Sequence, residues 1–464
     1  MAEHVPKRDE ARSRNEVAAA DASADKLPTA PPAERDWSRT QAFTFGSSAV
    51  LLLVNVVTGV LIARALGTDG RGEVTAILTL PATIGWVFAM GALQAVSYHH
   101  AKHPEDGARL IGSWLVLLLP LSVIAIIAGY TLLPALFAAQ TDAATDLARI
   151  YLLTILFQLF AEVTFGVLLG DHDFRFYNVV RVLMPAVTVI AYLLLWVLDQ
   201  FTVGSALLAT FLVSQVFSAL VAVRIFRRHG LARPSTSLMR STLWYGARAH
   251  GANVGGVVNA RLDLLIIPAF LAASSVGIYA VAIAATSVIP IIAGALSPLV
   301  LPAAARQGAR GARTVIRSLH ATLAVALALA IALALLADPA ITLVYGSAFE
   351  GSSSPVRLLL PGTVLYAAAG VLWSGLYAVN RPFTATMAQV AGAFVTVAGL
   401  LVFLRAGGVN AAALVTTTSY TIVFVVALVL YRRAAALRWT DFLPGRHRAL
   451  GRVPVDQTEP VVGR

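Results

Sequence analysis

The sequence contains no cysteine and few charged side chains. The absence of cysteine excludes disulfides, thiolate metal sites and a cysteine nucleophile. Asp, Glu, Lys and Arg make up 13% of the chain, whereas soluble domains carry about 25% charged residues. Hydrophobic residues account for 58%. This balance predicts an integral membrane protein rather than a soluble one.

The two ends of the chain lack the long apolar runs found elsewhere. Residues 1–42 are polar, rich in Ala, Asp, Arg and Pro, and have no apolar core of a secretory signal peptide. We therefore predict a disordered cytoplasmic tail there. Residues 432–464 hold seven arginines and three acids and predict a second, basic cytoplasmic tail.

Apolar segments follow one another between the tails without a large polar insertion. Their hydropathy predicts twelve membrane-spanning helices in an all-α fold, at residues 43–65, 74–97, 109–131, 147–168, 177–198, 203–225, 247–271, 278–302, 316–337, 356–378, 383–404 and 409–431. The loop 227–246 is basic and separates an N-terminal six-helix lobe, 43–226, from a C-terminal one, 247–431.

Arginine and lysine are distributed unevenly between the two sets of loops. With the N-terminus placed in the cytoplasm, the outward loops hold four basic residues, Arg71, Arg149, Arg357 and Arg405. The cytoplasmic loops then hold thirteen, namely Lys102, Arg109, Arg175, Arg224, Arg227, Arg228, Arg233, Arg240, Arg306, Arg310, Arg313, Arg317 and Arg381. This bias predicts cytoplasmic termini, and it explains the positive charge without a nucleic-acid partner.

The two lobes are similar at corresponding turns. Gly72 after the first span and Gly277 after the seventh are separated by 277 − 72 = 205 positions. Phe174 and Phe383, in turns four spans into each lobe, are separated by 383 − 174 = 209. Near-equal offsets with the same topology predict parallel repeats, and thus two pseudo-symmetric six-helix bundles with a substrate site between them.

The seventh span, 247–271, carries charged side chains inside its predicted membrane-spanning part. Arg261 and Asp263 each cost about 2.5–3.5 kcal/mol at the centre of a membrane helix, so neither is expected to face lipid. On a continuous helix, Arg248, Asn259 and Asp263 share one side and Arg261 lies on another. These two polar sides of the helix, or polar stripes, predict a pathway or pocket beside it. Structural salt bridges to neighbouring helices are the alternative.

Glu162 and Asp263 are the acids that fall well inside the predicted spans. Such rare intramembrane carboxylates are candidates for coupling transport to H⁺ or Na⁺. For Glu162, an interfacial or helix-pairing role is an equal alternative. His99 and His103 have the i, i+4 spacing of a zinc-binding pair. Because no third ligand lies nearby in the sequence, the histidines predict an interfacial helix end instead.

Three segments resemble the Wzx-type polysaccharide flippases of the MOP exporter superfamily. They are LIARALGTDGRGEV, NARLDLLIIPAFLAASSVGIYAVA and VYGSAFEGSSSPVRLLL. The residues that carry the resemblance are Ala63, Arg64, Leu66, Gly67, Gly70 and Gly72, then Arg261, Leu262, Asp263, Val276, Gly277 and Tyr279, and finally Tyr345, Gly346 and Phe349. The resemblance covers residues 43–431.

The resemblance implies a MOP/MATE-like fold and transport rather than an enzyme. The expected substrate is an undecaprenyl-diphosphate-linked oligosaccharide, moved from the cytoplasmic to the outer leaflet of the cell (inner) membrane by alternating access through a cationic cavity. A polysaccharide polymerase and glycosyltransferases would be partners, and no cofactor beyond a coupling ion is implied. Lipid II flippases of the same superfamily have two more helices, and their cavity arginines have no residue-by-residue match here.

Arginine suits a diphosphate because its donors form a planar fork. The implied diphosphate ligands are Arg261 first and Arg248 second, with Arg181 and Arg64 as weaker candidates that equally suit interfacial anchoring. Asn259 and Asn55 are further candidates for the substrate path, and Asn55 equally suits a helix–helix hydrogen bond.

Three other functions compete with the flippase. A MATE-like multidrug or metabolite cation antiporter would need a smaller and less cationic cavity. A polysaccharide polymerase or ligase would need a sizeable outward loop with catalytic groups, and the outward loops are short. A structural scaffold would not need intramembrane charges.

Overall fold

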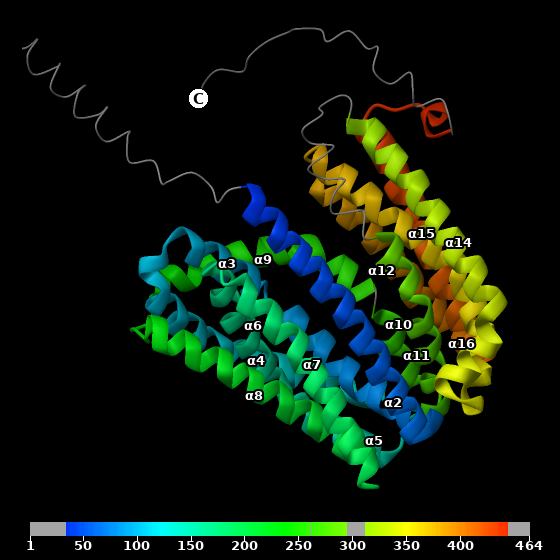
Figure 1. Ribbon diagram of the computed structural model, residues 1–464, viewed down its shortest axis with the longest axis horizontal. Helices are drawn as coiled ribbons and strands as arrows, with labels where there is room; N and C mark the ends of the chain where they lie inside the picture. Colours follow the sequence, from blue (N-terminus) through cyan, green and yellow to red (C-terminus); the bar gives the residue numbers. More distant parts are fainter. Residues whose placement is uncertain (1–33, 260, 295–310, 444–464) are drawn as a thin grey trace, which may run out of the picture. The chain divides into compact units, whose positions relative to one another are not determined.

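The computed structural model describes residues 34–259, 261–294 and 311–443. No strand occurs within these ranges, and helices account for most of them (Figure 1). The chain divides into two compact units, Met1–Val50 and Leu51–Arg464. The described residues of the first unit are helical, and the second unit contains the helices that pack together.

The described part of the N-terminal half contains seven α-helices and one short 3₁₀ helix. These are α2 (Glu34–Phe88), α3 (Ala92–Lys102), η1 (Pro104–Asp106), α4 (Gly107–Leu136), α5 (Asp142–Leu152), α6 (Thr154–Gly170), α7 (Phe174–Val197) and α8 (Val203–His229). The described part of the C-terminal half contains α9 (Thr236–Asn259), α10 (Leu262–Ile266), η2 (Ile267–Ala269), α11 (Ala273–Thr286), α12 (Val288–Gly294), α14 (Gly311–Tyr345), η4 (Ser347–Ser352), α15 (Ser353–Ala378), α16 (Pro382–Ala434) and η5 (Trp439–Phe442).

Two glycines divide the longest helices. Gly67 in α2 has φ 66° and ψ −165°, and Gly408 in α16 has φ 56° and ψ −142°. A side chain disfavours this left-handed, extended backbone, so glycine allows the chain to turn between two spans. Nine stretches of the described chain are long and apolar enough to cross a membrane. Doubling α2 and α16 adds two, and the run from α9 to η2 completes the predicted twelve.

Polar residues in the turns begin several helices. Thr141 accepts a hydrogen bond from the backbone N–H of Ala144 at the start of α5, at 3.2 Å. Thr202 and Ser205 form a reciprocal capping box at the start of α8. Such caps satisfy amide donors that the first helical turn leaves unpaired. The sequence thus sets helix starts through these side chains as well as through hydropathy.

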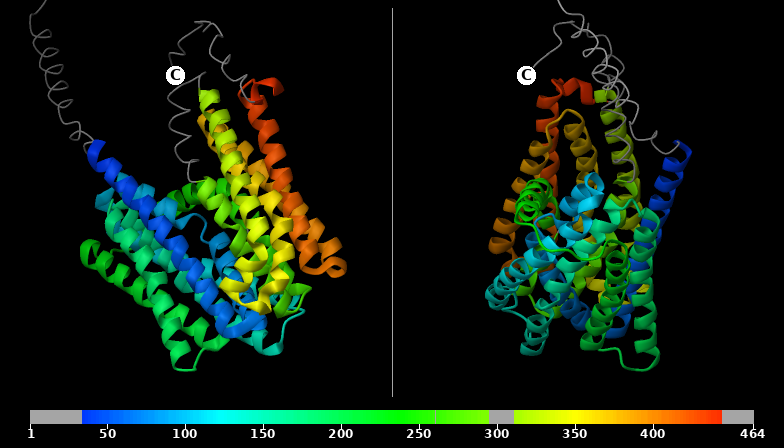
Figure 2. Two further views of the ribbon diagram at one scale, coloured as in Figure 1. Left: turned by 45° about the vertical axis from the view of Figure 1, so that its right-hand side comes forward. Right: turned by 90° about the vertical axis from the view of Figure 1, so that its left-hand side faces the viewer.

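Each half has its own apolar core. One cluster, from Ala76 to Ile225, fills the N-terminal half and includes the fully buried Trp114. A second cluster joins α11, α14, α15 and α16, with Ala63 of α2 added to it. Figure 2 shows α14, α15 and α16 side by side in both views, in agreement with their contacts. Separate cores are what two packed bundles require, and they confirm the predicted two-bundle fold.

Candidate functional site

The seventh span is a broken helix. α9 begins at Thr236, eleven positions before the predicted start at Ala247, and ends at Asn259. Arg261 has a non-helical backbone (φ −128°, ψ −7°) and precedes the five-residue helix α10. The prediction of one continuous helix over 247–271 is therefore wrong, as are the stripes drawn on it. Hydropathy missed the early turns because they are amphipathic, and it does not register a break in backbone geometry.

The carboxylate of Asp263 is enclosed within the C-terminal half. Its side chain accepts hydrogen bonds from the backbone N–H of Leu264 at 2.8 Å and from the hydroxyl of Tyr279 at 2.7 Å. Thr416 of α16 lies 3.4 Å from the same oxygen and 2.9 Å from the Tyr279 hydroxyl. The residue is 2% exposed. The carboxylate from α10 is thus surrounded by a backbone N–H of its own helix and by hydroxyl groups from α11 and α16.

No ion pair with Asp263 occurs among the residues that the structure describes. Arg261 is exposed, whereas Asp263 is buried, and the two side chains do not pair. A buried carboxylate without a basic partner has a large desolvation cost, which a proton or a bound cation can offset. The salt-bridge alternative is therefore not met for either residue within the described part of the chain.

The other predicted site residues lie apart from one another. Arg248 is exposed on α9, Asn55 is exposed on α2, and Arg181 is half-buried on α7. The side chain of Asn259 lies outside the described residues. Glu162 is half-buried on α6, one turn after Gln158, whose amide donates to the Ala82 carbonyl at 3.4 Å.

Arg64 joins the two halves. Its Nε donates to the carbonyl of Val344 at 2.8 Å, and a second nitrogen donates to the carbonyl of Leu343. Both acceptors belong to the last turn of α14, where cations are favourable because the final carbonyls of a helix have no partner. In this conformation, two nitrogens of the Arg64 guanidinium therefore bind backbone carbonyls of α14 rather than a ligand.

Two glycines bring the halves together near Arg64. A Cβ on Gly72 would lie 1.8 Å from the carbonyl oxygen of Ala273, and one on Gly277 would lie 2.0 Å from that of Thr68. Gly72 and Gly277 are the pair that the repeat offset matched, and the structure places them against each other. Gln140 adds hydrogen bonds to the nearby carbonyls of Pro268 and Leu271, at 2.9 and 2.8 Å. We call this contact the glycine-paired end.

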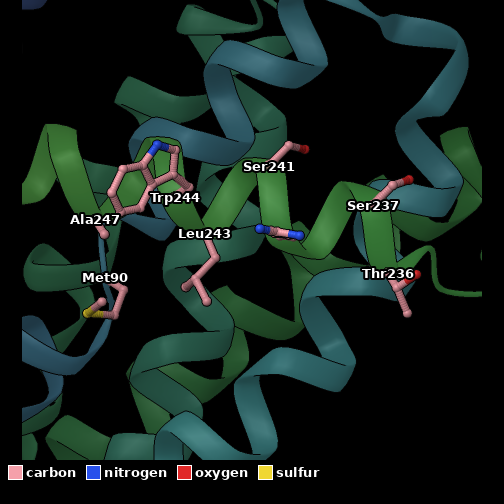
Figure 3. A pocket seen from close by; sticks show the side chains of 8 residues that line it. Met90, Thr236, Ser237, Ser241, Leu243, Trp244 and Ala247 are labelled. Carbon is pink, nitrogen blue, oxygen red and sulfur yellow. The ribbon is translucent and has the colours of Figure 1, made fainter.

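The first turns of α9 line a pocket of 1060 Å³ that sequence reasoning missed. Its lining residues are Met90, Thr236, Ser237, Arg240, Ser241, Leu243, Trp244 and Ala247. Figure 3 shows Thr236, Ser237, Ser241 and Trp244 following one another along α9. Trp244 is 66% exposed. The available signal was the spacing of four between Arg240, Trp244 and Arg248, which the prediction had divided between a loop and a span.

α9 lies against both halves. Gly246 packs against the start of α3, where a Cβ would meet the Met90 carbonyl at 2.4 Å. The ring centroids of Tyr98 and Tyr245 are 4.4 Å apart in a stacked arrangement. α9 also contacts α16 in the C-terminal half. A helix that touches both bundles and carries a pocket is well placed for a ligand that passes between them.

His99 and His103, which have the i, i+4 spacing of a zinc-binding pair, belong to no group of metal-ligating atoms among the described residues. His103 lies 3.3 Å from Glu105 at an exposed position, and the His99 ring packs edge-on against Tyr245. A different group of metal-ligating atoms, from His100, Asp171 and His229, lies within 4.8 Å of one another. Burial raises the pKa of Asp171, but hydrogen bonds from His229 and His100 outweigh burial and hold that pKa below its usual value.

Comparison with known sequences gives two matches. The sequence model of a family described as "Polysaccharide biosynthesis protein" matches residues 41–307. The probable low-salt glycan biosynthesis flippase Agl15 of Haloferax volcanii is 23% identical over 375 residues, which cover 78% of this chain and 76% of the relative.

Comparison with solved structures shows the fold. A structure of the lipid II flippase MurJ in an inward closed conformation has a TM-score of 0.72 at 16% identity, covering 87% of this chain and 88% of that chain. An inward-facing multidrug resistance MATE family transporter of the MOP superfamily has a TM-score of 0.68 at 17% identity, covering 83% and 94%. These likenesses confirm the predicted MOP/MATE-like architecture of a multi-pass membrane protein.

Proposed function

The chain belongs to the polysaccharide biosynthesis protein family, and from this premise we propose that it is a flippase for a lipid-linked oligosaccharide. The substrate of the proposal is an undecaprenyl-diphosphate-linked repeat unit, moved from the cytoplasmic to the outer leaflet of the inner membrane. The flippase relative from Haloferax volcanii supports the class of substrate. Both termini would be cytoplasmic, and a polysaccharide polymerase and glycosyltransferases would act before and after transport.

The observation that carries this proposal is the exposed face of α9. Ser237, Ser241, Trp244 and Arg248 are all exposed, and at 100° per residue they fall within about 60° of one another. Arg240 lies beside them in the same pocket. Guanidinium groups bind phosphate oxygens through paired donors, hydroxyls bind sugar hydroxyls, and an indole ring offers a flat face to a sugar ring. A sugar diphosphate needs this combination.

Alternating access fits the contacts between the halves. The glycine-paired end brings backbone against backbone, whereas the α9 pocket lies near Met90, at the turn before α3. With the predicted orientation, the glycine-paired end faces outward and the pocket faces the cytoplasm. The proposed cycle separates Gly72 from Gly277 and carries the headgroup past Arg261. The break between α9 and α10 provides a hinge at that point.

Asp263 is the proposed coupling residue. Its carboxylate, the Tyr279 hydroxyl and the Thr416 hydroxyl supply oxygen atoms from three elements. Such a group can take up a proton or Na⁺, and the cation changes the charge buried in the C-terminal half. Glu162 is a second candidate in the N-terminal half. The similar MATE structure would suit a cation antiporter, but exposed arginines on α9 disfavour a cationic substrate.

The proposal is tested by a leaflet-resolved assay in proteoliposomes. A fluorescent oligosaccharide on a prenyl diphosphate is placed in both leaflets, and a membrane-impermeant quencher reports what crosses. We expect protein-dependent translocation, with little for a prenyl phosphate that lacks sugar. Transport of organic cations but not of the glycolipid would contradict the proposal and favour the antiporter.

Variants on α9 connect the assay to the pocket. Arg248→Gln should slow translocation about 10- to 100-fold, since a hydrogen bond to a charged group contributes about 1.5–3 kcal/mol. Trp244→Ala should also slow translocation, because it removes the flat ring face that the sugar would contact. Matched controls are Trp439→Ala in η5 and Arg109→Gln in α4, which change exposed side chains of the same types outside the pocket. Equal rates in the pocket variants and the controls would remove this face from the substrate path.

A further inference from the structure

Three segments of the N-terminal half bring two imidazoles and a carboxylate together. His100 lies near the end of α3, Asp171 follows α6, and His229 is the last residue of α8. The Nε2 atom of His100 is 2.9 Å from one oxygen of Asp171, and the Nε2 atom of His229 is 2.9 Å from the other. The side chain of His100 is 1% exposed, that of Asp171 is 8% exposed and that of His229 is 13% exposed.

The backbone around the cluster leaves room for the two rings. A Cβ on Gly107 would lie 2.7 Å from Cε1 of His100 and 3.2 Å from Nδ1 of His229. A Cβ on Gly170 would lie 2.8 Å from Cβ of His100. The Nδ1 atom of His100 is buried and has no hydrogen-bond partner among the residues that the structure describes. The two glycines therefore leave room for a buried imidazole at the centre of the cluster.

We propose that His100, Asp171 and His229 form a binding site for a divalent transition-metal ion of the zinc type. In a tetrahedral zinc site with bonds of about 2.0–2.2 Å, ligand atoms are about 3.3 Å apart. Here the ligand atoms already lie within 4.8 Å of one another, so small rotations of the side chains suffice. Two imidazole nitrogens favour zinc over Mg²⁺ or Ca²⁺, which prefer oxygen ligands. A water molecule would supply the fourth ligand.

Arg228 sets the strength of the site. One of its nitrogens lies 3.4 Å from the Asp171 oxygen that also contacts His229. A guanidinium there competes with a metal ion for the carboxylate and repels it. Removing this charge should tighten metal binding, whereas removing a ligand should weaken it. A cluster held together by hydrogen bonds alone would show neither change.

An ion in this site would join three segments that are far apart in the sequence. It would fix the end of α3, the turn between α6 and α7, and the end of α8. Six residues separate the end of α8 from the start of α9, so the site would also anchor the entry to the α9 pocket. The inference concerns the stability of this face and does not depend on the transported substrate.

The test is metal binding by the purified, tag-free, full-length protein in detergent. After equilibrium dialysis against micromolar Zn²⁺, elemental analysis should find one ion per chain, and cobalt in its place should give visible absorption. Zinc should also raise the melting temperature, and a chelator should reverse the rise. His100→Ala and His229→Ala should weaken binding more than about 100-fold, since even the loss of outer-shell partners costs 10- to 100-fold.

The matched control is the double variant His99→Ala/His103→Ala, which removes two nearby histidines outside the cluster. It should bind zinc as the unchanged protein does. Absence of zinc from the unchanged protein, or loss of zinc only in this double variant, would overturn the proposal. If the single alanine variants do not fold, Arg228→Gln decides, because tighter binding supports the site and unchanged binding contradicts it.

Discussion

Two enclosed carboxylates, one in each half of the molecule, differ in the side chains that contact them. Asp171 faces two imidazoles and the guanidinium of Arg228. Asp263 has hydroxyl partners, Tyr279 and Thr416, and no ion pair within the described chain. The guanidinium of Arg228 can balance the charge of Asp171, whereas the uncharged donors around Asp263 leave a charge that a mobile cation can neutralise. This difference is the basis of our two proposals, that the first carboxylate stabilises the fold and that the second couples transport to a cation.

The substitution Asp263→Asn tests this difference with the largest expected effect on transport. The amide retains the shape and can still contact Tyr279, but it cannot take up a proton or balance a cation. We expect gradient-driven translocation to fall about 100-fold, which corresponds to about 2.7 kcal/mol, with little loss of stability. The measurement compares initial rates in vesicles with and without an imposed H⁺ or Na⁺ gradient. Unchanged dependence on both gradients would remove Asp263 from coupling.

Asp171→Ala should produce the opposite pattern. Removing this carboxylate leaves His100, His229 and Arg228 without their shared partner, at a cost of about 2 kcal/mol in the free energy of unfolding. Translocation per folded molecule should remain within about twofold, or about 0.4 kcal/mol. Thermal unfolding in detergent, with chelator present, measures the first quantity. A transport defect at full stability would make the two carboxylates alike and contradict the distinction.

Tyr279→Phe should have a smaller effect, on the cation dependence of transport. The variant removes the hydroxyl at 2.7 Å from Asp263 and leaves Thr416 in place. Loss of one hydrogen bond of about 1 kcal/mol should raise the half-saturating concentration of the coupling cation about fivefold. Tyr130→Phe, at an exposed position on α4, is the matched control. Equal cation dependence in the two variants would separate Tyr279 from the coupling site.

The sequence predicted the bundles better than the sites. Hydropathy and the matching Gly72 and Gly277 were enough for twelve spans and two halves, because a bilayer imposes a nearly fixed length on each apolar segment. Hydropathy could not reveal the break at Arg261, which depends on backbone geometry. Asp171 is 71 positions from His100 and 58 from His229, so only the packing of the bundle brings these residues together.

The site candidates on the seventh span depended on a continuous helix, which the structure does not contain. The sequence predicts Asp263 as a site candidate because acids are rare in membrane spans, but its hydroxyl partners come from α11 and α16, which local spacing does not reveal. Arg240 and Trp244 were overlooked because they precede the apolar part of α9. Their signal was a helical period that continued across a predicted boundary.

The most direct measurement is the translocation rate of the prenyl-diphosphate oligosaccharide by Arg261→Ala. Arg261 is exposed at the break between α9 and α10, where the headgroup must pass if the helix lines the path. The variant should be inserted and as stable as the unchanged protein, and its leaflet-resolved translocation should fall to the rate of protein-free vesicles. Translocation at the full rate would contradict a substrate path along this helix.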